Sequence, residues 1–327
     1  MSELTRDNPP LPRPKNDEKR AADSFAVNCK NAAERVADLL QESLAPNTRS
    51  AYLADLAHFE NWGGRIPADP ETIAAYLATH SDTLSVATLS RRLAALAKVH
   101  RSRGMANPVS SELVKSVLRG LRRVKGTAQQ QAKALLKEDL ILVLDATGEG
   151  LRDLRDRAVL LVGFAGGFRR SELVALTCKD IARVRQGMIL TLRRSKTDQT
   201  GEGRKIGIPL ARGPWCPVTA LEEWLARSGI AEGAIFRPID RHGRIGLEPL
   251  SGEAVSLIVK ERVRAAGINP AGYSGHSLRS GLATSAARAG IPSWKIRQQT
   301  GHASDTTLAP YIRDGELFRE NAAGALL

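Results

Sequence analysis

Hydrophobic residues recur at helical spacing through the first third of the chain. They fall three or four positions apart in five short runs, which is the period of one helix face. The runs are Val36, Leu39 and Leu40; Tyr52, Leu56, Phe59 and Trp62; Ile73, Tyr76 and Leu77; Leu89, Leu93, Leu96 and His100; and Val114, Val117, Leu118 and Leu121. Helix-start residues precede the last four runs: Pro46-Asn47-Thr48, Asp69-Pro70-Glu71, Ser85, and Ser110 or Ser111. Residues 25–124 are therefore predicted to form an all-helical bundle with these aromatic residues in its core.

The hydrophobic pattern becomes mixed after residue 137. Helical runs are followed by three short segments of strand character and then by further helices. They are 138–145 and 153–165; Asp180–Val184, Met188–Leu192 and Ile206–Leu210; and Pro217–Arg227, Ser251–Ala266 and a run that starts at His276. This order predicts that residues 138–327 form an α+β domain with a small antiparallel sheet. The chain as a whole is then mainly α and has two domains.

Two polar segments lie outside these domains. Residues 1–24 contain four closely spaced prolines and scattered charges, and we expect a disordered arm there. Residues 125–137 are polar and rich in glutamine, and they are predicted to be an interdomain linker.

Charge narrows the class of partner. The chain has 327 residues, a formal net charge of +13 and a pI of about 10.0, which favours a polyanionic partner and above all nucleic acid. A basic protein that is merely soluble remains the alternative. The three cysteines are far apart and show no disulfide or zinc spacing, as expected in a reducing cytosol. No signal peptide or membrane span is recognisable, so a cytoplasmic location is predicted.

Two of the predicted helices, at 85–103 and 110–125, carry an excess of cations on their outer faces. These cations are predicted to contact DNA phosphates, with groove insertion of the helices, whereas the alternative is a solvated surface. They are Arg91, Arg92, Lys98 and Arg101 on the first helix, and Lys115, Arg119, Arg122 and Arg123 on the second. The histidines His58, His80 and His100 lack metal-ligand companions at suitable spacing and are predicted to be structural.

The candidate chemistry lies near the C-terminus. His276 and Arg279 are three residues apart, which places them on one helix face. His302 follows a helix stop at Gly290 and Pro292, and Tyr311 comes nine residues later, directly after Pro310, where its helix must start or bend. Arginine binds phosphate bidentately, histidine transfers protons near neutral pH, and a tyrosine hydroxyl can be a covalent nucleophile. Together these residues suit phosphoryl transfer through a phosphotyrosine.

Four pieces of sequence, in this order and at these spacings, resemble the tyrosine recombinases, also called the phage integrase family. They are Gly167-Phe168-Arg169-Arg170-Ser171-Glu172-Leu173, Ser195-Lys196-Thr197, His276-Ser277-Leu278-Arg279, and Thr300-Gly301-His302 followed by Tyr311. The resemblance spans residues 43–313, and the two-domain plan, the length and the basic segment from Lys115 to Lys125 are most similar to the Cre-like members. Many relatives have a third histidine where this chain has Ser280, a position that is usually supporting.

The resemblance implies a metal-free and cofactor-free reaction on double-stranded DNA. Tyr311 would attack the scissile phosphate and form a 3′-phosphotyrosine. Arg169 and Arg279 would clamp the non-bridging oxygens, and His302 would add a third hydrogen bond. Lys196 would protonate the leaving 5′-oxygen, His276 would take the Tyr311 proton or position the phosphate, and Glu172 would orient the first box.

The resemblance also implies a site-specific recombinase that integrates, excises or resolves a mobile element or plasmid through a Holliday junction. Four protomers would assemble on two DNA sites of a bacterial nucleoid, with the C-terminal tail docked on a neighbouring subunit or on its own domain. A type IB topoisomerase and a DNA-binding regulator that no longer cuts are the alternatives, and retention of the complete set of candidate catalytic residues argues against the regulator.

Overall fold

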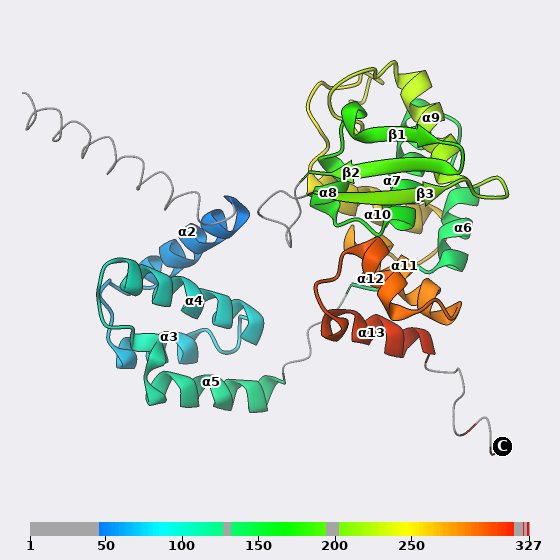
Figure 1. The fold of residues 1–327 in the computed structure, drawn as a ribbon. Helices are drawn as coiled ribbons and strands as arrows, with labels where there is room; N and C mark the ends of the chain where they lie inside the picture. The colour runs from blue at the N-terminus through cyan, green and yellow to red at the C-terminus, as the bar shows by residue number, and fades with distance from the viewer. Residues whose placement is uncertain (1–45, 127–131, 194–202, 317–322, 324–325, 327) are drawn as a thin grey trace, which may run out of the picture. The chain divides into compact units, whose positions relative to one another are not determined.

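The computed structural model describes residues 46–126, 132–193, 203–316, 323 and 326 (Figure 1). The chain divides into two compact units, Met1–Gln129 and Gln130–Leu327. The predicted arm at 1–24, the first apolar run at 36–40, the predicted loop lysine, Lys196, and most of the C-terminal tail after residue 316 lie outside the described residues. The mainly helical fold with a small antiparallel sheet confirms the predicted fold class.

The first unit is helical throughout its described part. Its helices are α2 (Pro46–Asn61), α3 (Pro70–Thr79), α4 (Val86–Ser102), the short 3₁₀ helix η1 (Pro108–Ser110) and α5 (Glu112–Lys125). Asp69, Ser85 and Ser111 cap α3, α4 and α5 by accepting a backbone N–H in the first turn, as their positions in the sequence predict. The core combines Phe59, Ile73, Tyr76, Leu77, Leu89, Leu93, Leu96 and Val114.

Arg92 lies inside this bundle rather than on its outer face, which corrects the sequence-based expectation. Its Nη1 donates to the Tyr76 hydroxyl at 2.9 Å and lies 2.6 Å from His58 Nδ1, and its Nε is 3.6 Å from the buried Asp55 carboxylate. The reason is helical geometry: Arg92 comes three residues after Leu89 and four before Leu96, so it shares their face. Asp55 supplies the charge that a buried guanidinium requires.

The predicted structural role of the three histidines agrees with their surroundings. His100 is fully buried; its Nε2 accepts the Ala68 N–H at 3.0 Å, so its Nδ1 donates to the Leu96 carbonyl at 2.7 Å. The rings of His58 and His80 stack edge-on at 4.8 Å between centroids. All of these contacts lie within the helical unit, so the three rings serve its packing.

The second unit combines a small sheet with helices. In chain order the elements are α6 (Lys137–Asp145), α7 (Leu151–Gly166), α8 (Arg170–Val174), η2 (Cys178–Asp180), β1 (Ile181–Val184), β2 (Gly187–Leu192), β3 (Arg204–Pro209), α9 (Pro217–Ser228), α10 (Gly252–Ala265), α11 (His276–Arg288), α12 (Ser293–Thr300) and α13 (Asp305–Glu316). No helix in the described part of the chain combines the length and the apolar character that crossing a bilayer requires.

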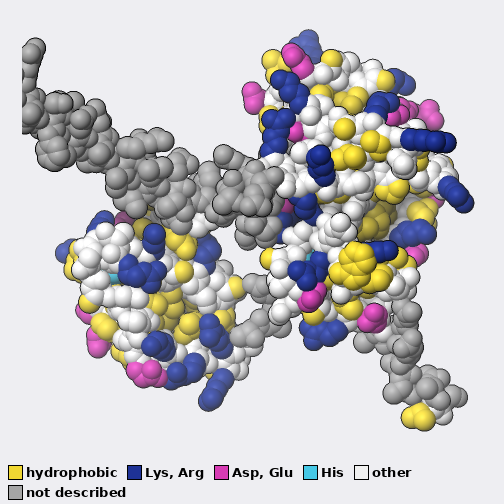
Figure 2. Space-filling model, in the orientation of Figure 1, with side chains coloured by type: hydrophobic (Ala, Val, Ile, Leu, Met, Phe, Trp, Pro, Cys, Tyr) yellow, Lys and Arg dark blue, Asp and Glu magenta, His cyan; other side chains and the backbone are white. Residues whose placement is uncertain are grey.

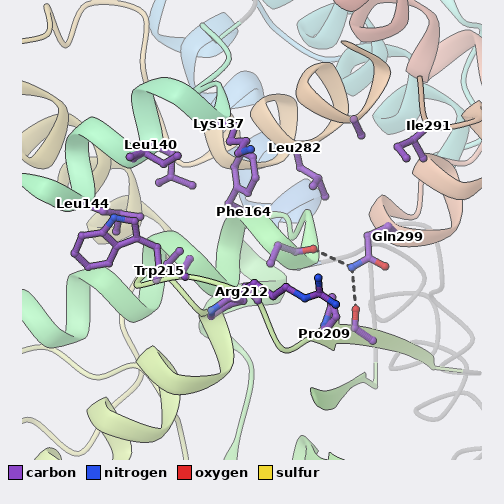
Figure 3. Close-up of a pocket in the computed structure, with 18 of the residues that line it drawn as sticks. Lys137, Leu140, Leu144, Phe164, Pro209, Arg212, Trp215, Leu282, Ile291 and Gln299 are labelled. Carbon is purple, nitrogen blue, oxygen red and sulfur yellow. Dashed lines mark hydrogen bonds between the residues drawn. The ribbon is translucent and has the colours of Figure 1, made fainter. Parts of the chain in front are cut away.

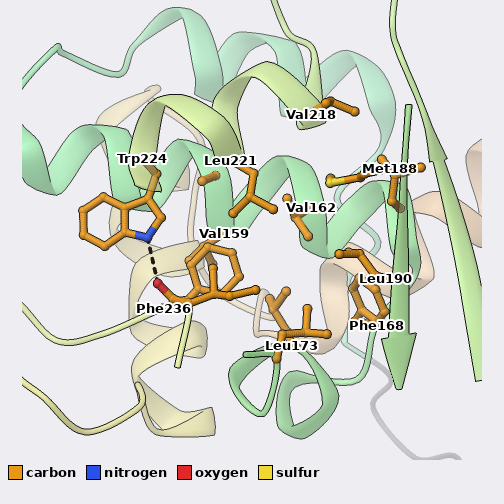
Figure 4. Close-up of a cluster of buried hydrophobic side chains, with 14 of the residues drawn as sticks. Val159, Val162, Phe168, Leu173, Met188, Leu190, Val218, Leu221, Trp224 and Phe236 are labelled. Carbon is orange, nitrogen blue, oxygen red and sulfur yellow. Dashed lines mark hydrogen bonds between the residues drawn. The ribbon is translucent and has the colours of Figure 1, made fainter. Parts of the chain in front are cut away.

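The sheet is an antiparallel meander in the order β1-β2-β3. Leu190 of the central strand pairs with Ile181 on one side and with Ile206 on the other. The apolar face of β2 and β3 packs against α7 and α9 in the largest hydrophobic cluster, where Trp224 Nε1 donates to the Ile235 carbonyl at 2.8 Å (Figure 4). The sheet and these two helices therefore share one core.

The end of the predicted linker belongs to the second unit. Lys133 and Leu135 donate backbone hydrogen bonds to the carbonyls of Gly272 and Ser277, at 2.9 and 3.0 Å. The Leu135 side chain is fully buried. A Cβ at Gly281 of α11 would overlap the Leu135 backbone, so glycine allows this segment to pass directly over the helix.

Candidate active site

The first motif, residues 167–173, begins at a glycine that ends helix α7. Gly167 ends α7 in the left-handed conformation, with φ = 57°, and Arg169 then starts α8 as its N-terminal cap residue. Glu172 binds Arg169 twice: one carboxylate oxygen accepts the Arg169 backbone N–H at 2.9 Å, and the other accepts from Nη1 at 2.5 Å. The Glu172 side chain is only 2% exposed, so a buried carboxylate fixes the position of the Arg169 guanidinium. The spacing of three residues predicts this ion pair.

Arg279 is buried beneath this turn and is 1% exposed. Its Nη1 donates to the Gly167 carbonyl at 2.8 Å and also to the Thr300 carbonyl. Burial, and after it the positive charge of Arg169, lower the pKa of Arg279 to about 10. Arg279 thus joins the first motif to the end of α12, while Arg169 Nη2 donates to the next carbonyl, that of Gly301, at 3.3 Å.

His302 follows the left-handed Gly301 that ends α12. Its Nδ1 lies 2.7 Å from the Thr300 hydroxyl, and that hydroxyl also lies 2.7 Å from the Ile296 carbonyl. A carbonyl only accepts, so the hydroxyl proton goes to Ile296 and the Thr300 oxygen accepts the His302 Nδ1–H. Nε2 is then the nitrogen left for a substrate. Burial, followed by the charges of Arg279 and Arg169, lowers the pKa of His302 to about 3.

Tyr311 lies between the two candidate histidines. Its hydroxyl is 2.8 Å from His276 Nε2, and its ring centroid is 6.3 Å from that of His276 and 5.7 Å from that of His302. Burial raises the pKa of Tyr311, whereas burial and the charges of Arg279 and Arg169 lower the pKa of His276. The neutral imidazole therefore faces a protonated phenol, and the pair is arranged for proton transfer.

The structure also locates the residues that the motifs left ambiguous. Arg170 points to α10, where it lies 3.3 Å from Glu253, so Arg169 is the site arginine. The Ser280 hydroxyl donates to the His276 carbonyl at 3.2 Å and stays within α11. The helix of Tyr311 does not start at Pro310, because α13 begins at Asp305 and Pro310 lies inside it.

One residue near this site was missed in the sequence, and another was quoted in a motif without a role. Thr300 stands in the third motif, but no function was assigned to its hydroxyl. Arg204 gives no such signal, yet its guanidinium binds the last carbonyls of α12.

The predicted DNA-contact residues other than Arg92 are exposed on α4 and α5: Arg91, Lys98, Arg101, Lys115, Arg119, Arg122 and Arg123. Figure 2 shows cationic side chains gathered over the helical unit. Arg119 is paired with Glu112 at 2.5 Å, and Arg91 with Asp55 at 2.5 Å, whereas α5 ends in a run of cations. This surface can bind phosphates along a nucleic-acid backbone.

A separate apolar groove of about 830 Å³ lies beside β3, between α6, α7, α11 and α12 (Figure 3). Leu140, Leu144, Phe164, Trp215 and Leu282 form much of its wall. None of the candidate catalytic side chains that the structure describes lines it. Within the described residues, no cluster of three or more histidines, cysteines and carboxylates could hold a metal ion.

Known proteins are similar to this chain in sequence over most of its length. The sequence model of the phage integrase family matches residues 125–316, and that of the phage integrase N-terminal SAM-like domain matches residues 36–103. An integrase/recombinase xerD homolog of Selenomonas ruminantium is 40% identical over 293 residues, which is 86% of each chain. The recombinase cre of Escherichia phage P1 is 29% identical and covers 76% of this chain and 77% of its own.

Solved structures share the fold at low sequence identity. The XerH recombinase bound to palindromic difH substrate has a TM-score of 0.62 at 19% identity, over 85% of this chain and 78% of its own. A lambda integrase tetramer bound to a Holliday junction has a TM-score of 0.57 at 18% identity, over 88% and 78% of the two chains. The extent of the sequence matches confirms the predicted resemblance: the chain belongs to the phage integrase family, the tyrosine recombinases.

Proposed function

We propose that this chain is a site-specific DNA recombinase that cuts and rejoins DNA with Tyr311 as its nucleophile. The observation that carries the proposal is the placement of the Tyr311 hydroxyl 2.8 Å from His276 Nε2, in a site that also holds Arg169, Arg279 and His302. A phenol beside a neutral base, with fixed cations close by, suits attack on a phosphodiester.

The bond changes in this reaction balance without an external energy source. The Tyr311 oxygen bonds to phosphorus as its proton passes to His276, and the bond from phosphorus to the 5′-oxygen breaks. The DNA then carries a 3′-phosphotyrosine, and the leaving 5′-oxygen takes a proton from Lys196, the role that the family resemblance implies. Attack by the 5′-hydroxyl of another strand reverses these steps and releases Tyr311.

The cations have distinct roles in the proposal. Arg169 and Arg279 bind the non-bridging phosphate oxygens and oppose the charge that grows in the transition state. The anionic phosphate favours the charged imidazolium, so His302 takes up a proton from solvent on Nε2 when the phosphate binds and then donates it to a phosphate oxygen, while Thr300 accepts the Nδ1–H and keeps the ring in place. Glu172 orients Arg169 and takes no part in the bond changes.

The partner is double-stranded DNA, and the protein acts as an assembly of copies. The finer proposal is a tetramer on two recombination sites, which is supported by the shared fold with the lambda integrase tetramer. The exposed cations of α4 and α5 would contact the phosphates, residues 25–124 would form the domain that binds the core DNA site, and residues 138–327 would form the catalytic domain. A nucleoid-associated location in the cytoplasm suits the net charge of +13.

Covalent trapping on nicked suicide DNA tests the proposal. The wild-type protein should form a protease-sensitive adduct on its own site, and Tyr311→Phe should bind the same DNA without forming one. Tyr273→Phe is the matched control, because Tyr273 is a buried tyrosine of the same unit whose hydroxyl is 3.5 Å from Asp139. DNA binding by wild type without an adduct would overturn the enzyme proposal, and an adduct that persists in Tyr311→Phe would show that the nucleophile is another residue.

A further inference from the structure

The C-terminal end of α12 is held by arginines from three other segments of the chain. A helix end leaves its last carbonyls without intrahelical partners, and those groups must be bound elsewhere. Here the carbonyls of four successive residues, 298–301, all accept from guanidinium groups. Arg279 and Arg169 account for part of this set, and both belong to the proposed phosphate clamp.

Arg204 supplies the remaining contacts. Its Nη1 donates to the carbonyls of Gln298 and Gln299, at 3.1 and 3.0 Å, and its Nη2 donates to that of Thr300 at 3.4 Å. Gly301 lies against the guanidinium, since a Cβ there would be 2.6 Å from Arg204 Cζ, and its φ of 69° also favours glycine. A cation at a helix C-terminus is also favoured by the helix dipole.

The hydrogen bonds of Arg204 connect α12, the helix that precedes His302, to the sheet. Arg204 is the first residue of β3 and pairs with Leu192 of β2. A second contact runs in parallel: Gln299 Nε2 donates to the Gly207 carbonyl of β3 at 3.1 Å and to the Ala165 carbonyl of α7 at 2.8 Å (Figure 3). The position of the C-terminal end of α12 is therefore fixed by its hydrogen bonds to β3.

Arg204 acts on the site without belonging to the clamp. Two of its guanidinium nitrogens are engaged by backbone carbonyls, so its charge is fixed in place. That charge is among the causes that lower the pKa of His302 and of Arg279. The carbonyl that Arg204 shares with Arg279 belongs to Thr300, whose hydroxyl orients the His302 ring.

We propose that Arg204 is a positioning residue for strand cleavage: it fixes the end of α12 so that His302 and Arg279 keep the geometry that a bound phosphate requires. The inference rests on the proposed function and extends it to a residue of β3. Arg204 itself is not expected to contact the substrate. A displacement of about 1 Å in a reacting group can cost on the order of a hundredfold in rate.

The test compares Arg204→Gln and Arg204→Lys with Lys205→Gln. Lys205 is the matched control because it is the next cation on the same strand and is exposed. We expect single-turnover cleavage of suicide DNA to slow by about a hundredfold in Arg204→Gln, with DNA affinity within about twofold of wild type, and to recover partly in Arg204→Lys. Lys205→Gln should cleave at the wild-type rate.

A second readout follows His302 in the free protein and needs no DNA. Imidazole resonances, assigned by comparison with His302→Asn, should show a higher His302 pKa and a less uniform Nδ1–H tautomer in Arg204→Gln. Because this measurement is independent of cleavage, it tests the positioning role even if wild type forms no adduct.

Wild-type cleavage by a folded Arg204→Gln, or an unchanged His302 titration, would overturn the proposal. So would equal losses of DNA affinity in Arg204→Gln and Lys205→Gln, since these would indicate phosphate contacts. If Arg204→Gln does not fold, Arg204→Lys is measured by both readouts, and wild-type values in both would overturn the proposal.

Discussion

The Tyr311 hydroxyl and His276 Nε2 lie 2.8 Å apart. Tyr311 belongs to α13 and His276 begins α11, so the contact joins two helices of the second unit. The pKa of Tyr311 is raised by burial and the pKa of His276 is lowered by burial and nearby arginines. An unactivated phenol thus has an acceptor for its proton within hydrogen-bond distance.

Substitution of His276 should remove this acceptor. His276→Gln is expected to slow cleavage by about 10²- to 10³-fold, because general-base catalysis typically contributes at this scale. The lowered pKa keeps the wild-type imidazole neutral down to pH values below the ordinary 6.5, so the wild-type rate should fall only as pH drops through that lower value. Single-turnover rates across pH check both points, and a variant that retains the same acid limb would assign the limb to another group.

The Thr300 hydroxyl should matter through His302. Thr300→Val removes the acceptor of the Nδ1–H at 2.7 Å while nearly preserving side-chain volume. We expect cleavage to slow by about tenfold, the equivalent of roughly 1.4 kcal/mol, and Thr300→Ser to remain close to wild type. Equal rates for Thr300→Val and wild type, measured on suicide DNA, would show that the ring is oriented by other contacts.

Removal of Arg92 should destabilise the helical unit. Among the described residues, Arg92→Met leaves the buried Asp55 with the partly exposed Arg91 as its one remaining salt-bridge partner. Breaking a buried ion pair costs about 3–5 kcal/mol, and the remaining partner places the expectation near roughly 3 kcal/mol. Thermal or urea unfolding checks this, with the exposed Arg101→Met as the control that should change stability by less than about 0.5 kcal/mol. A control loss as large as that of Arg92→Met would contradict the buried role.

Two glycines in helices should respond oppositely to alanine. At Gly281 of α11 a Cβ would overlap the Leu135 backbone, so Gly281→Ala should destabilise the second unit by at least roughly 2 kcal/mol. At Gly120 of α5 nothing lies within 4 Å of a built Cβ, and Gly120→Ala should stabilise by about 0.5–1 kcal/mol. The unfolding midpoints of the two variants test this prediction of opposite stability changes. Destabilisation by both substitutions would contradict it.

The cations of α5 should appear in the salt dependence of DNA binding. Arg122 is exposed near the end of this helix, and Arg122→Gln should weaken binding similarly on all sequences. It should reduce the slope of log affinity against log salt concentration by about one. Arg183→Gln is the comparison, because Arg183 lies on β1 and is paired with Glu222 at 2.7 Å. An equal change of slope in both variants would mean that α5 has no special part in binding.

The sequence was sufficient for features that depend on residues close together along the chain. In the described part of the first unit the period of apolar residues located the helices, and Asp69, Ser85 and Ser111 marked helix starts because a capping hydroxyl or carboxylate binds only two or three residues ahead. The pairing of Arg169 with Glu172 followed from a spacing of three. The motif spacings were enough to predict the family, which the sequence matches confirm.

Tertiary structure decided the contacts between distant segments. Arg204 binds carbonyls more than ninety residues further along the chain, and any residue type could have supplied those backbone groups, so no motif could mark them. Arg92 shares a face with Leu89 and Leu96, which the α4 pattern alone contains, but the partners that hold its charge there, Asp55, His58 and Tyr76, come from other helices. Local periodicity records which face a residue occupies, whereas the partner on that face is set by the packing of the whole unit.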